Sequence, residues 1–199
     1  FNKIIYRFFR KGNAQRSFEN AQKLIIRGIK TPRPIAFYEE KTCLFLKSSF
    51  YVCEYINYDF TIREPLKNFE LNKNQNIIKL FVKFTFFLHE NNVNFLDHSP
   101  GNTLIKLKNN KIEFYLVDVN RLKFIKMKKY NRLANFSRIS KNKNIIKLIA
   151  KEYSNLYKLN YEYTYKTIWK NILNFRLWFN LKKRIKNHFF SKSINKHTS

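Results

Sequence analysis

A polar loop at residues 95–102, "FLDHSPGN", lies between two segments with different hydrophobic periodicities. Before the loop, residues 77–90 repeat apolar side chains every three or four positions, which predicts an amphipathic helix. After the loop, Thr103–Lys108 and Lys111–Val117 have the composition of strands, and the Asn109-Asn110 pair between them tolerates the positive φ of a tight turn. A helix, a loop and a hairpin in this order predict a mixed α and β fold.

The region N-terminal to this unit predicts one helix followed by strands. Residues 14–27 have helical periodicity, and Gly28 follows them in the position where glycine commonly ends a helix. The prolines of "TPRPI" then favour an extended path. The strands are predicted at residues 35–39, 42–47 and 50–56. The polar residues 57–76 predict an irregular connection.

The C-terminal third predicts helices near residues 142–158 and 161–180, followed by a basic tail. A chain of 199 residues is long enough to bury a substantial core, and 44% apolar and 18% aromatic residues argue against disorder. The most apolar stretch, Ile77–Leu88, is interrupted by Lys79 and Lys83 and is too short to span a bilayer.

The formal net charge of +27 predicts attraction to polyanions such as nucleic acid, anionic membrane or phosphorylated ligands. No zinc-ligand set, RNA-binding motif or basic zipper is present in the sequence, so we expect no specific nucleic-acid partner. Cys43 and Cys53 lack the spacing of a zinc site or a disulfide framework, which favours two reduced cysteines in a cytosolic protein.

Three oxygen-bearing side chains suit one chemical task. Asp97 and Asn102 are five residues apart in the polar loop, and Asp118 follows the apolar strand residues "FYLV". Asn102 and Asp118 would supply the hard oxygen ligands that Mg²⁺ prefers, while Asp97 would orient a hydroxyl and accept its proton. Phosphoryl transfer requires little more from a protein than positioning and charge neutralisation. Alternatively, Asp97 and Asn102 only cap local turns.

The pattern D-x-x-x-x-N, then a hairpin, then two apolar residues and Asp resembles the protein-kinase signature. It departs from that signature at Phe95, where a histidine is usual, at Asn120, where a glycine is usual, and at Ser99, where Ser/Thr protein kinases carry lysine. With "DHSPGN", "DVNR", "RSFENAQKL" and "GIKTPRPIA", the chain is similar to the lipopolysaccharide core kinase family (Kdo/WaaP type) over roughly residues 14–125.

The resemblance implies an α+β, two-lobed protein-kinase-like fold with a partial N-lobe and a mostly helical C-lobe. Residues 1–56 would hold the remnant of the N-lobe, with an αC-like helix and the strands leading to the hinge. Residues 57–199 would form the C-lobe, with the catalytic loop and the metal-site hairpin. Because the chain begins at Phe1 and its only methionine is Met127, we expect an N-terminally truncated fragment. Without the phosphate-binding lysine that the family carries, this fragment is expected to have little or no activity of its own.

By the same resemblance, Asp97 and Asn102 are catalytic, Asn102 and Asp118 bind Mg²⁺, and ATP is the phosphoryl donor. Glu19 is similar to the αC glutamate that pairs with a phosphate-binding lysine. That lysine is expected upstream of residue 1, because Lys3 and Lys11 lie too near the start of the helix. The alternative for Glu19 is a solvated helix charge.

The hinge and three residues beside the site complete the predicted contacts. Backbone groups near Glu54 and Ile56 would meet adenine. His98, Ser99 and Arg121 are candidates for phosphate or substrate contact. For His98 the alternative is a surface position, and for Arg121 a role in covering the loop.

His89 stands at the end of the helix predicted at residues 77–90, where a cation suits the helix dipole.

The resemblance therefore predicts a kinase that transfers the γ-phosphate of ATP to a hydroxyl of a lipopolysaccharide core sugar. It also predicts a peripheral location at the cytoplasmic face of the bacterial inner membrane, where a basic protein would dock on anionic lipid. Two alternatives stay open. One is a kinase-like enzyme acting on a protein hydroxyl, and the other is a non-catalytic basic module that binds nucleic acid or membrane.

Overall fold

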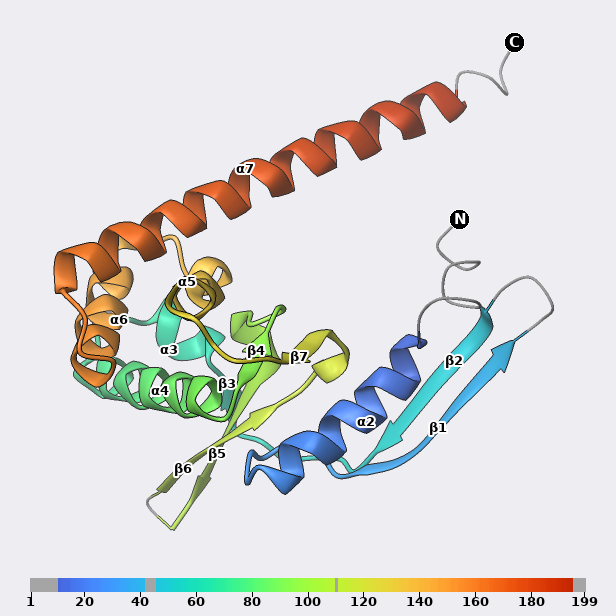
Figure 1. Ribbon diagram of the computed structural model, residues 1–199, viewed down its shortest axis with the longest axis horizontal. Coiled ribbons are helices and arrows are strands. Elements are labelled where there is room, and N and C mark those ends of the chain that lie inside the picture. The colour runs from blue at the N-terminus through green and yellow to red at the C-terminus, as the bar shows by residue number, and fades with distance from the viewer. Residues whose placement is uncertain (1–10, 42–45, 110, 195–199) are drawn as a thin grey trace.

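The computed structural model describes residues 11–41, 46–109 and 111–194 (Figure 1). Helix α2 (Asn13–Ile26) packs against the antiparallel pair of β1 (Pro34–Lys41) and β2 (Leu46–Cys53) at one end of the molecule. Gly28 follows α2 with a φ of 68°, so the predicted helix-ending glycine is confirmed.

The remaining elements form the larger part of the molecule (Figure 1). In chain order they are β3 (Phe60–Thr61), α3 (Arg63–Lys67), α4 (Asn72–Glu90), β4 (Val93–Phe95), η1 (Pro100–Asn102), β5 (Thr103–Lys108), β6 (Lys111–Leu116), η2 (Val119–Arg121), β7 (Leu122–Phe124), α5 (Lys129–Ala134), η3 (Asn135–Arg138), α6 (Lys143–Leu156) and α7 (Tyr161–Ile194). The three strands β3, β5 and β6 pair in that order, and β4 pairs with β7, all antiparallel. The helix, loop and hairpin predicted from the sequence are α4, the segment ending in η1, and β5–β6.

Two apolar clusters hold these elements together. The larger one packs α4, α6 and α7 against the hairpin, with Phe81 and Tyr153 fully buried in it. The smaller one joins α2 to β4 and β7 through Leu24, Phe95 and Leu122. Burial of one such side chain stabilises a fold by about 1.5–3 kcal/mol. The second cluster therefore anchors α2 to the strand that leads into the polar loop.

The prediction of three strands between residues 35 and 56 is wrong. Ser48 and Ser49, which fall between the predicted second and third strands, lie inside β2 and pair with Glu40 and Glu39 of β1. Ser48 Oγ donates to a Glu40 carboxylate oxygen at 2.7 Å, so these small polar residues find polar partners on an exposed strand pair. Residues 42–45, which include Cys43, lie outside the described residues.

The prediction of an irregular segment at residues 57–76 is also wrong. That segment contains β3, α3 and the first residues of α4, which begins at Asn72 rather than at Ile77. Its early turns are polar because they face solvent, and Asn74 Nδ2 donates to Asn68 O at 2.7 Å, outside the helix. The hydrophobic pattern marks only the part of the helix that packs against the core.

Helix α7 continues to Ile194, well beyond the predicted end near residue 180. No glycine or proline interrupts residues 161–194, and the run of lysines read as a tail continues the helix. Figure 1 shows the last turns of α7 extending past the rest of the molecule. In the described part of the chain, no helix combines the length and the apolar character that crossing a membrane requires.

His89 lies in the last turn of α4, as predicted, but it is not a cation there. The side chain is fully buried, and its Nδ1 and Nε2 atoms bind Tyr153 Oη (2.7 Å) and Asn135 Oδ1 (3.3 Å). Asn135 Nδ2 in turn donates to Asn94 Oδ1 of β4, so the network fixes the strand that enters the polar loop. Burial lowers the pKa of His89 to about 3, which keeps the ring neutral.

His98 is also buried, which corrects the prediction that it contacts substrate or solvent. Its side chain is 1% exposed, and its ring lies 5.6 Å from the Phe95 ring and 5.2 Å from the Phe81 ring, centroid to centroid. Neither ring nitrogen has a hydrogen-bond partner among the described residues. Burial lowers the pKa of His98 to about 3. His98 therefore acts as an apolar ring that packs the polar loop onto α4.

We expect the free energy of unfolding to decrease as pH falls below about 6.5. Both histidine pKa values lie below the ordinary value of 6.5, so the unfolded chain binds the protons preferentially. Each contribution is complete above pH 6.5 and is lost towards pH 3, at up to about 1.4 kcal/mol per pH unit. Urea unfolding at several pH values between about pH 7 and about pH 5 measures this decrease in the free energy of unfolding. A His98→Phe variant should show a smaller decrease, and an unchanged decrease would contradict this account.

Candidate active site

Hydrogen bonds close the loop at residues 95–102 into a compact unit. Ser99 N donates to Asp97 O (2.7 Å), and Asn102 N donates to Ser99 O (3.0 Å). Asn102 Nδ2 also donates to Asp97 O (2.9 Å), so one predicted catalytic side chain holds the backbone of the other. Asn102 Oδ1 receives no hydrogen bond from the residues that the structure describes.

The β5–β6 hairpin brings Asp118 next to Asn102. Thr103 pairs with Leu116, and Val117 N donates to Asn102 O at 3.1 Å. Asp118 has a φ of 54°, a left-handed backbone conformation that is uncommon outside glycine and that Asp and Asn tolerate best. Its carboxylate is exposed and makes no hydrogen bond or ion pair within the described ranges. A strained residue with an unused carboxylate is typical of a functional position.

Two further contacts fix the segment after Asp118. Asn20 Nδ2 of α2 donates to Val119 O at 2.8 Å, and Asn20 is buried. Leu96 N donates to Arg121 O at 3.2 Å, which continues the β4–β7 pairing. These hydrogen bonds fix the positions of helix α2, the polar loop and the segment after the hairpin relative to one another.

Two arginines hold the Asp97 carboxylate. Arg121 Nη1 lies 3.1 Å from Asp97 Oδ2, and Arg138 Nη1 donates to Asp97 Oδ1. The Asp97 side chain is only 15% exposed, so these pairs form in a partly dehydrated position. Arg121 was predicted to bind phosphate or to cover the loop, and in this structure it pairs with the loop's aspartate. Arg138 was missed, because it lies 41 residues further along and no motif marks it.

The sequence profile described as "Lipopolysaccharide kinase (Kdo/WaaP) family" matches residues 2–161. The chain belongs to this family. It is therefore a phosphotransferase of the kinase class, and the resemblance predicted from the sequence is confirmed.

One solved structure agrees with this lipopolysaccharide kinase assignment at the level of the fold, and a second match is weaker. The structure titled "WaaP in complex with acyl carrier protein" matches with a TM-score of 0.56 and 12% identity, over 85% of this chain and 74% of that one. A Rio2 kinase–ADP/Mg²⁺–phosphoaspartate complex from Chaetomium thermophilum matches with a TM-score of 0.44 and 13% identity, over 79% of this chain and 44% of that one. No curated protein sequence matches the chain. The predicted α+β, protein-kinase-like fold is confirmed.

Two of the three departures of this kinase from the protein-kinase signature, those at Phe95 and Asn120, have a structural reason. Phe95 replaces a histidine and is fully buried in the cluster that joins α2 to β4. Asn120 replaces a glycine in η2, where the residue with positive φ is Asp118 rather than residue 120. A glycine is therefore not required at residue 120 in this conformation.

Glu19 has a partner that the sequence interpretation dismissed. Lys11 Nζ lies 2.7 Å from both carboxylate oxygens of Glu19, although Lys11 comes only two residues before α2. The extended backbone of Gly12, between Lys11 and the helix, lets the long Lys11 side chain fold back along the first two turns of α2. The hydrogen bond from Lys11 lowers the pKa of Glu19. Both side chains are partly exposed, so this pair is open to exchange for another cation.

The predicted adenine-binding segment is the connection that follows β2. Glu54 N donates to Arg33 O at 2.9 Å, and the Glu54 carboxylate pairs with Arg33 Nη2 at 2.7 Å. Ile56 is half-buried in the same connection. Contact of Glu54 and Ile56 with adenine stays a prediction, as does the division of the chain into lobes at residue 56.

The donor set at Asn102 and Asp118 fits magnesium. An amide oxygen and an exposed carboxylate, both unused by other described residues, are hard oxygen ligands from adjacent backbone positions. Among the described residues there is no group of three or more His, Cys, Asp or Glu side chains that would hold a metal ion by itself. Mg²⁺ commonly takes one or two protein ligands and completes its shell with phosphate and water.

Proposed function

We propose that this family member uses ATP and Mg²⁺ to phosphorylate a hydroxyl of a sugar in the lipopolysaccharide core. The observation that carries the proposal is that Asn102 binds the Asp97 backbone and accepts a hydrogen bond from Val117, which places the left-handed Asp118 beside them. Membership of the lipopolysaccharide kinase family supports the choice of a core sugar over a protein hydroxyl.

The proposed roles follow from the geometry. Asn102 Oδ1 and the Asp118 carboxylate would hold Mg²⁺, which would neutralise charge on the phosphates of ATP. Asp97 would orient the acceptor hydroxyl and take its proton. Since Arg121 and Arg138 hold the Asp97 carboxylate, they would fix its direction and would also lie near the phosphoryl group being transferred. The chain's own part in the reaction is therefore positioning and charge compensation.

Transfer of label from γ-³²P-ATP tests the acceptor. The complete protein would be incubated with Mg²⁺ and either lipopolysaccharide with its core or lipid A without core sugars. Label in the first and none in the second supports the proposal. Label in added protein substrates instead of lipopolysaccharide would favour the protein-kinase alternative. Polyanion binding with no nucleotide binding would favour the non-catalytic basic module.

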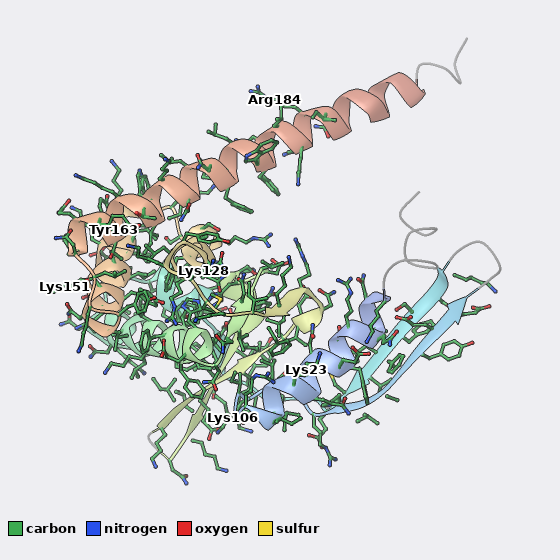
Figure 2. The ribbon with its side chains drawn as sticks, in the orientation of Figure 1. Lys23, Lys106, Lys128, Lys151, Tyr163 and Arg184 are labelled. Atoms are coloured by element: carbon green, nitrogen blue, oxygen red, sulfur yellow. The ribbon has the colours of Figure 1, made fainter. Side chains whose placement is uncertain are left out.

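We further propose that the distal half of α7 docks the protein on the anionic cytoplasmic face of the inner membrane. Leu177, Trp178, Leu181 and Ile185 have helical spacing on one face, and all are exposed. At 100° per residue, Lys182 and Arg184 fall on the two edges of this stripe. Figure 2 shows Arg184 on the part of α7 that extends beyond the body of the protein. An apolar stripe between cations suits anionic lipid better than a neutral partner.

Replacing Leu177 and Leu181 by Gln should weaken binding to phosphatidylglycerol vesicles about tenfold or more, because both side chains would enter the acyl boundary. Co-sedimentation measures the partition coefficient. The matched control replaces Leu107 and Ile125, two similarly exposed apolar residues elsewhere, by Gln. Equal binding by both double variants, or equal binding of the unmodified protein to phosphatidylcholine, would contradict the proposal.

A further inference from the structure

A strongly basic cleft lies beside the candidate catalytic loop. Its volume is about 880 Å³, and its lining includes five cationic side chains and no carboxylate. The five are Arg63 and Lys67 of α3, Arg138 of η3, Lys141 and Arg176. A smaller hollow of about 280 Å³ shares Arg138, Lys141 and Arg176 and reaches Ser99 of the loop. The two hollows place a concentrated positive charge along one side of residues 97–101.

Two contacts show how close this cleft comes to the reacting groups. Arg138 donates to the Asp97 carboxylate and also lines the cleft. At the other end of the loop, a side chain at Gly101 would begin only 2.8 Å from Arg63 Nη2. A ligand in the cleft would therefore lie against the same loop that carries the proposed base.

Most of this charge has no counterion within the described residues. Of the five cations, Arg138 forms an ion pair with Asp97, and Arg63 helps to lower the pKa of Glu64 by charge attraction. Lys67, Lys141 and Arg176 have no acidic partner among the described residues. The nearby carboxylate of Glu64 accepts hydrogen bonds from Thr61 Oγ1 (2.7 Å) and Thr61 N (2.9 Å). Like charges gathered around one hollow repel one another, so an anion that enters it gains from each of them. Arginine forks bind carboxylate and phosphate groups with particular strength.

The cleft lies apart from the predicted nucleotide site. Its lining comes from α3, η3, α7 and the segment between η3 and α6. No residue of α2, β1, β2 or η2 takes part, and these elements carry or adjoin Glu19, the hinge and Asp118. An anion here would approach Asp97 from the helical side of the molecule, where an acceptor would enter.

We propose that Arg63, Lys67, Lys141 and Arg176 form an acceptor subsite that binds a carboxylate or phosphate group already present on the saccharide to be phosphorylated. This inference rests on the proposed function and adds the chemical class of the acceptor. The anion would be bound in the cleft while a hydroxyl of the same saccharide lies at Asp97. An acceptor without such a group would bind weakly.

The test replaces Lys67, Lys141 and Arg176 together by Gln in the complete protein and leaves Arg63 and Arg138 in place. We expect the KM for lipopolysaccharide to increase about tenfold or more, with the KM for ATP changed less than about twofold. The matched control removes three lysines from the β5–β6 hairpin, by Lys106→Gln, Lys108→Gln and Lys111→Gln. If the two triple variants have the same KM for lipopolysaccharide, the inference is overturned.

Chemically altered acceptors identify the anion. Lipopolysaccharide stripped of phosphate and lipopolysaccharide with reduced carboxyl groups would each be tested with both triple variants. On one altered acceptor, the Lys67/Lys141/Arg176 variant and the hairpin control should have the same KM. That acceptor lacks the group that the cleft binds. If the difference persists unchanged on an acceptor that lacks both groups, the inference is wrong.

The outcome is separable from that of the proposed function. If the unmodified protein transfers no phosphate to lipopolysaccharide, the proposed function fails. Calorimetric binding of deacylated lipopolysaccharide still tests the cleft in that case. Binding that is lost in the Lys67/Lys141/Arg176 variant and kept in the hairpin control supports the subsite, and equal binding by both contradicts it.

Discussion

An Asp97→Asn variant of the complete protein should lose about 10²–10⁴-fold in kcat and keep its affinity for Mg²⁺-ATP. The substitution removes the proton-accepting carboxylate and keeps the size of the side chain. The Asn102 amide binds the backbone oxygen of Asp97 rather than its side chain, so the hydrogen bond that closes the loop is unaffected. Arg121 and Arg138 would retain one amide oxygen to bind.

Single-turnover phosphoryl transfer and equilibrium binding of a fluorescent ATP analogue separate the two effects. A matched control is Glu70→Gln, which removes one carboxylate from an exposed position with no described partner. The control should behave as the unmodified protein. Equal kcat for Asp97→Asn and Glu70→Gln would rule out Asp97 as the base.

Asp118→Asn should reduce Mg²⁺-dependent ATP binding by about tenfold or more, with little remaining turnover, because the exposed carboxylate is the only charged member of the proposed metal pair. Asparagine is the informative replacement. It tolerates the φ of 54° at this position, whereas most other residues would add backbone strain to the loss of charge.

Calorimetry with ATP at several Mg²⁺ concentrations measures this effect, and vesicle and heparin binding provide the comparison. A kinase should lose metal-dependent nucleotide binding and keep its attraction to polyanions. The loss of one carboxylate hardly changes a net charge of +27. If nucleotide binding is the same in Asp118→Asn and the unmodified protein, the magnesium site at Asn102 and Asp118 is refuted.

Local pattern was sufficient to predict the central part of the fold. The core-facing part of α4, the polar loop and the β5–β6 hairpin are contiguous in sequence, and periodicity and turn residues report directly on such neighbours. The same contiguity explains why Asp97, Asn102 and Asp118 could be selected together, since they are linked by the loop and by one strand pair.

Contacts between distant segments were not predictable in this way. Arg138 reaches Asp97 across 41 residues, and His89 reaches Tyr153 across 64. His98 stands among polar loop residues, yet the fold places its ring against Phe95 and Phe81. A single sequence carries no signal for such pairs, because whether a polar side chain is exposed, paired or buried depends on which elements pack over it.

The sequence alone therefore determined the order of the elements around the loop, the family and the three oxygen-bearing residues of the candidate site. Tertiary structure decided that two arginines hold Asp97, that two histidines are buried and neutral, and that α3, η3 and α7 gather cations into one cleft. The physical reason is range. Backbone propensity and turn chemistry act over a few residues, whereas burial and charge pairing depend on what the folded chain brings near.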